Sequence, residues 1–301
     1  MNRLSHAGII LISFVNIFCS GNRSNTGIIY PEPIPDSVAL NFLPGIVCSD
    51  TLDFNAAFSP DGKSFYFCRS HNRKYLLLET VFDGQTWASP KPFLSVDTAF
   101  SNADPFITAD GTMYFMSDRP ASQGDTLKDF DIWVMRKEGE KWGKPENIAV
   151  VNSDSVEYYV SVAANGNLYF SSNRTGGFGE HDIYVSRNVN GHYTKPVNLG
   201  SAINSPGVEH DPLISPDENL LIFTAVDRAD GLGQADLYYA SRNADNTFKP
   251  ATNMGSKINT KTYEYCPSYS PDQKFFFYSS EFDVKWIGLN FMQSNILTQH
   301  K

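Results

Sequence analysis

Five side chains that could act together chemically stand at the same distance from five similar turns. Each lies eight residues before the third residue of its turn, and four of the five are carboxylates. They are Asp53, Asn102, Glu157, Glu209 and Glu264. Carboxylates that converge can bind Ca²⁺, and their mutual repulsion raises pKa values. A carboxylate pair in unlike surroundings can instead supply the acid and the base of glycoside hydrolysis.

The turns that define this spacing indicate the fold that would position the acids. They are Ser59-Pro60-Asp61-Gly62, Thr108-Ala109-Asp110-Gly111, Ala163-Ala164-Asn165-Gly166, Ser215-Pro216-Asp217-Glu218 and Ser270-Pro271-Asp272-Gln273. They recur roughly every 50 residues, a period typical of propellers and solenoids. Each turn is followed by a bulky strand such as Phe65-Tyr66-Phe67, so the repeating unit contains a β-hairpin.

The third repeat shows the expected unit in full. Alternating residues 157–162 precede the turn, 168–171 follow it, and a glycine-rich loop leads to a third strand over 182–186. We expect residues 192–196 to form the fourth strand, because an outer edge strand tolerates Pro196. The sequence therefore predicts an all-β chain: a β-propeller with five four-stranded blades.

The end of the chain predicts how the ring closes. The fifth repeat has no fourth strand of its own, whereas residues 41–47 resemble the outer segment around Pro196–Gly200. We expect this N-terminal strand to complete the last blade, which protects its edge. Six blades are the alternative, if the N-terminal segment contains a degenerate repeat.

The N-terminus has the features of a secretory signal. Arg3 precedes an apolar stretch from Ala7 to Phe18, and Cys19 follows it directly, as in a bacterial lipoprotein signal. We expect a signal peptide over 1–19 with lipidation at Cys19, a proline-containing tether over 20–38, and one propeller domain over 39–301. The chain would then be a periplasmic or outer-membrane lipoprotein that contacts the membrane only through its lipid. Simple secretion is the alternative.

Charge and cysteine usage exclude several classes of protein. The net charge is −9 and no Lys/Arg cluster stands out, so we expect no nucleic-acid partner. Without Cys19, the odd set of Cys48, Cys68 and Cys266 contains no C-x-x-C pair. We therefore expect neither a structural disulfide nor a zinc site.

The repeats resemble the WD40-like (PD40) repeats of TolB-type bacterial envelope proteins. The resemblance is carried by residues 58–67, by 169–174 with 179 and 182–184, and by 214–217, and it extends over roughly residues 40–290. It implies a propeller fold and peptidoglycan-associated or outer-membrane partners. Such repeats also occur in scaffolds, peptidases and lyases, so the fold alone does not specify the function. This chain departs from the pattern because repeats one and five lack the arginine and the glycine-rich loop.

Because innermost strands line the axis of a propeller, we expect the aligned acids to gather at one mouth of the channel. Asp53, Glu157, Glu209 and Glu264 are candidates for a Ca²⁺ or cationic-ligand site. The alternative is a structural cap in which each acid accepts hydrogen bonds from the amides of a neighbouring blade. His210 joins the candidates, since it stands between two acids. Aromatic residues occupy its position in other repeats, which favours an aromatic contact between blades. Arg119, Arg174 and Arg228 are each expected to brace the loop that follows or a neighbouring blade.

We find no motif that assigns catalytic residues. No G-x-S-x-G elbow is present, and the glycine-rich loop does not open a helix. We therefore interpret the chain as a non-enzymatic envelope protein that presents its propeller to a protein or glycan partner. A glycan-active enzyme, a glycosidase or lyase using acids at the channel mouth, is the alternative.

Overall fold

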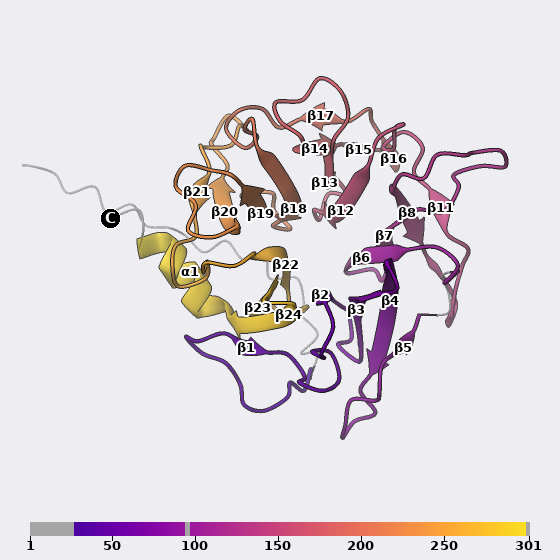
Figure 1. Cartoon of the computed structure of the whole chain (residues 1–301), viewed down its shortest axis with the longest axis vertical. Helices are drawn as coiled ribbons and strands as arrows, with labels where there is room; N and C mark the ends of the chain where they lie inside the picture. Colours follow the sequence, from indigo (N-terminus) through magenta and orange to yellow (C-terminus); the bar gives the residue numbers. More distant parts are fainter. Residues whose placement is uncertain (1–26, 94–96, 299–301) are drawn as a thin grey trace, which may run out of the picture.

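Five four-stranded antiparallel sheets surround a common axis and form a β-propeller (Figure 1). The computed structural model describes residues 27–93 and 97–298. From the axis outward, the first three blades are β2 (Asp53–Phe58), β3 (Ser64–His71), β4 (Lys74–Val81) and β5 (Lys91–Pro92); β6 (Asn102–Ile107), β7 (Met113–Ser117), β8 (Asp131–Met135) and β11 (Glu146–Asn147); and β12 (Glu157–Val162), β13 (Leu168–Ser172), β14 (Asp182–Ser186) and β17 (Val197–Asn198). Blade 4 contains β18 (Val208–Ile214), β19 (Leu220–Val226), β20 (Ala235–Ser241) and β21 (Thr252–Asn253), and blade 5 contains β22 (Tyr265–Tyr269), β23 (Phe275–Ser280), β24 (Asp283–Gly288) and β1 (Leu40–Asn41). The predicted all-β propeller with five blades is confirmed.

The N-terminal strand closes the ring, as the sequence predicts. β1 pairs antiparallel with β24, with Leu40 opposite Trp286, so it completes blade 5 rather than beginning a sixth blade. The next residue, Phe42, is fully buried and packs against Phe65 of blade 1 and Phe277 of blade 5. This aromatic contact joins the first and last blades, which are far apart in the sequence.

The predicted fourth strand at 192–196 is wrong in its position. His192–Tyr193 forms β16, which pairs with β15 (Asn188–Val189) in a small separate hairpin, and the outer strand of blade 3 is Val197–Asn198. Blade 2 has the same hairpin, formed by β9 (Lys137–Glu138) and β10 (Lys141–Trp142). The proline thus lies between hairpin and outer strand, where no ladder hydrogen bond from its nitrogen is needed.

The propeller has two faces, which we name after their connections. The turn face carries the five β-turns, at 59–62, 108–111, 163–166, 215–218 and 270–273. The loop face carries the connections between second and third strands, at 72–73, 118–130, 173–181, 227–234 and 281–282, and the crossings to the next blade. On the turn face, Glu218 stands where earlier turns have glycine and adopts φ 58°. Its carboxylate accepts hydrogen bonds from Asn167 and Tyr169, so this left-handed residue joins blade 4 to blade 3.

The segment before β1 lies against the propeller from its first described residues. Tyr30 donates a hydrogen bond to Asp272 on the turn face, and its ring packs 4.6 Å from that of Phe275. The signal peptide, Cys19 and the first part of the predicted tether lie outside the described residues. At the other end, α1 (Leu289–Thr298) packs Leu289 and Met292 against blades 4 and 5. Within the described residues, no helix combines the length and apolar character required to span a bilayer.

Candidate functional site

The four predicted acids are fully buried at the start of their inner strands, and each is bonded within its own repeat. Glu209 accepts hydrogen bonds from the backbone nitrogen (2.8 Å) and hydroxyl (2.5 Å) of Ser205, four residues earlier. The same pair of bonds is found for the other three acids. The donors are Ser49 for Asp53, Ser153 for Glu157 and Thr260 for Glu264. The carboxylates therefore fix the crossing between blades. They act as a structural cap, but their donors lie in their own repeats and not among the amides of a neighbouring blade.

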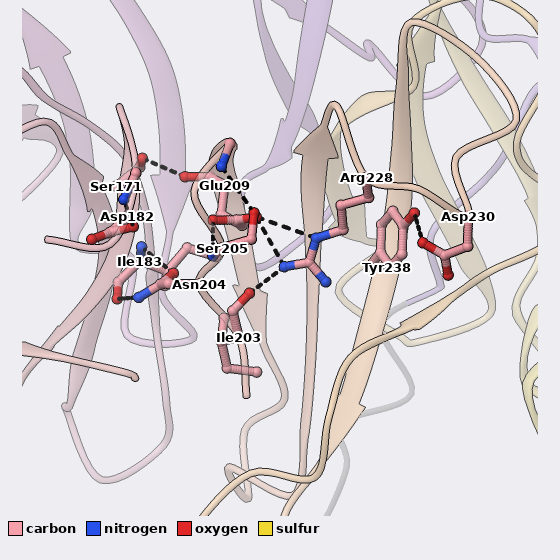
Figure 2. A network of polar contacts seen from close by, with 12 residues as sticks. Ser171, Asp182, Ile183, Ile203, Asn204, Ser205, Glu209, Arg228, Asp230 and Tyr238 are labelled. Carbon is pink, nitrogen blue, oxygen red and sulfur yellow. Dashed lines mark hydrogen bonds and ion pairs between the residues drawn. The ribbon is translucent and has the colours of Figure 1, made fainter. Parts of the chain in front are cut away.

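In three of the four repeats that have an aligned acid, an arginine also donates to that acid. Figure 2 shows Arg228 of β19–β20 reaching Glu209 at 2.9 Å and the Ile203 carbonyl oxygen. Arg174 holds Glu157 in the same way, and Arg119 donates to the amide oxygen of Asn102. These side-chain bonds brace the inner strand, and those of Arg174 and Arg228 also hold the crossing from the neighbouring blade, whereas none of them goes to the loop that follows. Each arginine donates to a residue at the start of its own inner strand.

Repeat one contains this arginine as well, contrary to the sequence interpretation. Arg69 lies 2.5 Å from Asp53 and donates to the Val47 carbonyl oxygen. The alignment missed it because it stands at the end of β3, directly before a tight hairpin instead of a glycine-rich loop. In blade 5 the hydroxyls of Thr262 and Ser280 take the place of an arginine beside Glu264.

Each predicted acid thus has several donors, and none of these contacts joins one acid to another. In residues 27–93 and 97–298, no group of three or more His, Cys, Asp and Glu side chains is arranged to hold a metal ion. The Ca²⁺ site at the channel mouth stays a prediction.

His210 occupies the aromatic position between blades that the sequence indicates. Its ring lies 6.0 Å from that of Tyr158 in blade 3 and 5.9 Å from that of Tyr263 before blade 5. Nε2 is 2.7 Å from the Tyr263 hydroxyl, and Nδ1 is 2.9 Å from Asp211 Oδ1. His181 is half-buried and packs against Tyr158, and burial lowers its pKa.

A second set of aligned residues lies nearer the axis and was not predicted. Two positions after each aligned acid or Asn102, the inner strand bulges, and the bulged residue has a positive φ although it is not glycine. These residues are Asn55 (63°), Asp104 (51°), Tyr159 (45°), Asp211 (51°) and Cys266 (51°). All five are buried. Such a conformation is costly for a side chain larger than glycine and persists where the surrounding fold imposes it.

The bulged residues connect the blades around the axis. Asn55 donates to Asp104 (3.4 Å), and the Cys266 backbone nitrogen donates to Asp211 Oδ2 (2.9 Å). Tyr159 of blade 3 donates to the Pro267 carbonyl oxygen of blade 5 at 2.6 Å. The axis is thus crossed by a buried polar network.

Two carboxylates in this network have unlike surroundings. Burial, and then the charge of Asp211, raise the pKa of Asp104 well above its ordinary value. Asp104 has an amide donor, whereas Asp211 has a backbone donor and an imidazole beside it. Pairs of this kind are found where one carboxyl acts as an acid and the other as a base.

Exposed apolar side chains lie at equivalent positions on the loop face. Leu127, Phe178 and Leu232 each stand four residues before the aspartate that begins the third strand, and they are 49%, 52% and 47% exposed. Two of these loops are held by that aspartate: the Phe178 nitrogen donates to Asp182 at 2.5 Å, and the Leu232 nitrogen donates to Asp236. The Leu127 nitrogen donates instead to Asp125 within its own loop. Phe282, in the hairpin of blade 5, adds a fourth exposed apolar side chain to this face.

An open hollow of about 440 Å³ lies on the loop face of blade 4. It is lined by the crossing segment 204–207 and by the start of the β19–β20 loop, including Asp227 and Asp230. Sequence reasoning found neither the hollow nor the apolar positions. The spacing of the apolar residues from the loop-ending aspartates was the visible signal.

Comparisons with known proteins support the fold. A putative TolB from Agrobacterium tumefaciens is 18% identical, with a TM-score of 0.50 over 77% of this chain and 71% of that one. An alpha-L-arabinofuranosidase from Lactobacillus brevis is 11% identical, with a TM-score of 0.54 over 86% and 94% of the two chains. A thermostable family-43 glycoside hydrolase is 13% identical, with a TM-score of 0.51 over 86% and 91%.

No protein-family model matches the sequence, and neither does any curated protein. At these identities the solved structures show a shared fold and nothing finer. The chain is therefore similar in structure to a putative TolB and to glycan-degrading propellers alike.

Proposed function

We propose that this chain is a non-enzymatic binding protein of the bacterial cell envelope, which presents the loop face of its propeller to a partner. The observation that carries the proposal is the repeated exposure of Leu127, Phe178 and Leu232 at one equivalent position. Aliphatic and aromatic side chains mounted on rigid loops lose little conformational freedom on binding, which favours affinity. The partner is an envelope protein or glycan, and the proposed lipid at Cys19 is the only contact with the membrane.

The use of the aligned acids agrees with this function. Because Asp53, Glu157 and Glu209 are buried and hydrogen-bonded within their own repeats, they stabilise the crossings that carry the loops. The loop-ending aspartates act similarly, since Asp182 accepts bonds from two backbone nitrogens of its loop. The polar residues inside the propeller therefore hold the exposed apolar residues in place.

Site-specific photo-crosslinking in native envelopes tests the proposal. A crosslinking residue at Phe178 should capture a reproducible, stoichiometric partner, whereas one at the turn-face residue Val81, also exposed, should not. Serine substitutions at Leu127 and Leu232 should then reduce capture at Phe178 without changing the melting temperature. Equal capture from both faces, or no capture while a control complex crosslinks, would remove the loop face from consideration.

A glycan-active enzyme is the second candidate, and one observation favours it. Asp104 and Asp211 are buried carboxylates with unlike partners, which is what an acid and a base require. Hydrolysis of a panel of oligosaccharides by the wild-type chain, and its loss in Asp104→Asn with the fold intact, would favour this candidate. If the wild-type chain hydrolyses none of these oligosaccharides, Asp104 and Asp211 have a structural role.

A further inference from the structure

The hollow on the loop face of blade 4 has an acidic lining that the fold does not use fully. Asp227 and Asp230 are both exposed and three residues apart. The Tyr238 hydroxyl donates to Asp230 Oδ1 at 2.7 Å, as Figure 2 shows. Within the part of the chain that the structure describes, no side chain donates to the Asp227 carboxylate or to the other oxygen of Asp230.

The one arginine in the lining does not neutralise these two carboxylates. Arg228 directs its guanidinium away from the hollow's acids, toward Glu209 and the Ile203 carbonyl oxygen (Figure 2). Its ring contacts, with Phe223 at 5.2 Å and Tyr238 at 4.8 Å, hold it in that position. The hollow therefore has negative charge available for a ligand from outside the chain.

Exposed apolar side chains stand on both sides of the hollow. Leu232 follows Asp230 by two residues on the same loop. On the other side, Gly179 packs so closely on the carbonyl oxygens of Ser205 and Gly207 that any side chain there would collide with them. The neighbouring Phe178 is thereby held beside the crossing segment that lines the hollow.

We propose that this hollow takes the lysine or arginine side chain of a protein partner whose adjacent residues are apolar. The inference deepens the proposed binding function and rests on it. A basic side chain complements the free carboxylate oxygens of Asp227 and Asp230, and apolar neighbours would cover Phe178 and Leu232. The net charge of −9 attracts a basic partner, which increases the association rate at low ionic strength.

A titration with short peptides tests this recognition directly. The probes are acetyl-Leu-Lys-Leu-amide, acetyl-Leu-Glu-Leu-amide and the neutral sugar chitotriose, followed by backbone amide shifts of the full propeller domain. We expect the lysine peptide to shift the amides of Gly207, Gly231 and Gly233, and the glutamate peptide to leave them unchanged. Raising the ionic strength should weaken the lysine peptide's binding, because its charge interacts near the surface.

Two pairs of substitutions separate the hollow from general charge effects. Asp227→Asn with Asp230→Asn should weaken binding of the lysine peptide about tenfold, or about threefold for each exposed charge. The control, Asp50→Asn with Asp154→Asn, removes the same charge from exposed residues in other crossings between blades and should leave binding unchanged. Equal effects of the two pairs, indifference to the peptide's charge, or chitotriose binding at these amides would each overturn the proposal.

Failure of this proposal can be told apart from failure of the proposed function. If crosslinking through Phe178 in envelopes persists in the Asp227→Asn/Asp230→Asn variant and the lysine peptide does not bind, the loop face binds its partner without the hollow. If neither Phe178 nor Leu127 crosslinks to a partner, the proposed function itself is wrong.

Discussion

Removing Arg174 should destabilise the propeller through the carboxylate that it leaves behind. Its guanidinium is 2.9 Å from Glu157, donates to the Val151 carbonyl oxygen at 2.7 Å, and lies over the rings of Phe170 and Tyr184. Glu157 is fully buried, so water cannot replace the lost donor. Breaking a buried ion pair from one side costs about 3–5 kcal/mol.

The structure places Arg174→Met at the lower end of that range. After the substitution, Glu157 would keep the nitrogen and hydroxyl of Ser153 and the hydroxyl of Ser172 as donors. Blade 5 shows that such a set can suffice, because Glu264 is held by hydroxyls and a backbone nitrogen without an arginine. We therefore expect a loss of about 3 kcal/mol, which lowers the melting temperature by about 8 °C for a domain of this size.

Urea unfolding of three variants measures this cost. The matched control is Arg136→Met, because Arg136 and Glu146 form an ion pair 3.3 Å apart in which both side chains are more than half exposed. Exposed pairs contribute about 1 kcal/mol or less. Adding Glu157→Gln to Arg174→Met should restore part of the stability, since it removes the unpaired buried charge. The reasoning is refuted if Arg174→Met lowers the free energy of unfolding by no more than Arg136→Met does. It is also refuted if adding Glu157→Gln lowers that free energy further.

Three further outcomes are expected. Phe42→Ala should cost about 3–5 kcal/mol in urea unfolding, because this fully buried ring joins blades 1 and 5; a loss below 1 kcal/mol would refute the closure by residues 40–48. The free energy of unfolding of Asp104→Asn, relative to that of the wild-type chain, should increase from pH 4 to pH 7. The raised pKa of Asp104, due to burial and Asp211, makes the native state hold a proton that the unfolded state releases, so wild-type stability falls with pH by up to about 1.4 kcal/mol per unit; parallel pH profiles would contradict this. Calorimetry with millimolar Ca²⁺ tests the predicted cation site, and an absence of heat would remove it.

The repeating turns made the architecture predictable from sequence. A Ser-Pro-Asp-Gly turn before an aromatic strand has a local cause, because Ser59 bonds both Asp61 and the nitrogen of Ser64. Thr108, Ser215 and Ser270 bond the aspartate of their turns in the same way, and Asn165 accepts from the Asn167 nitrogen in the third repeat. The number and order of blades followed from this recurrence. The sequence did not distinguish the hairpin at 188–193 from an outer strand, because both are short, polar and close to a proline.

The role of the aligned acids depended on partners that spacing alone does not reveal. An alignment places Glu157 and Glu209 at one position but does not say whether they face the channel or the crossing between blades. The hydroxyl four residues before each acid, as in Ser153 and Ser205, was present in the sequence and would have favoured the structural interpretation.

The axial residues were beyond prediction for a different reason. Tyr159 and Cys266 have no intrinsic preference for positive φ, and the bulge is imposed by the packing of five inner strands around one axis. No local pattern marks them. Their equivalence becomes visible only when each is counted from the aligned acid, or from Asn102, two positions before it.

The path of the N-terminal segment gives the two faces different surroundings. The described chain begins on the turn face, where Tyr30 bonds Asp272, and it reaches the loop face only after β1 has paired with β24. Seven residues lie between Cys19 and Gly27, a reach of about 30 Å at most. If Cys19 carries the proposed lipid, the anchored segment meets the propeller on the turn face, opposite the loop face that carries Leu127, Phe178 and Leu232. An anchor in this position would leave the loop face open to a partner beyond the membrane surface, which is the arrangement that the proposed function requires.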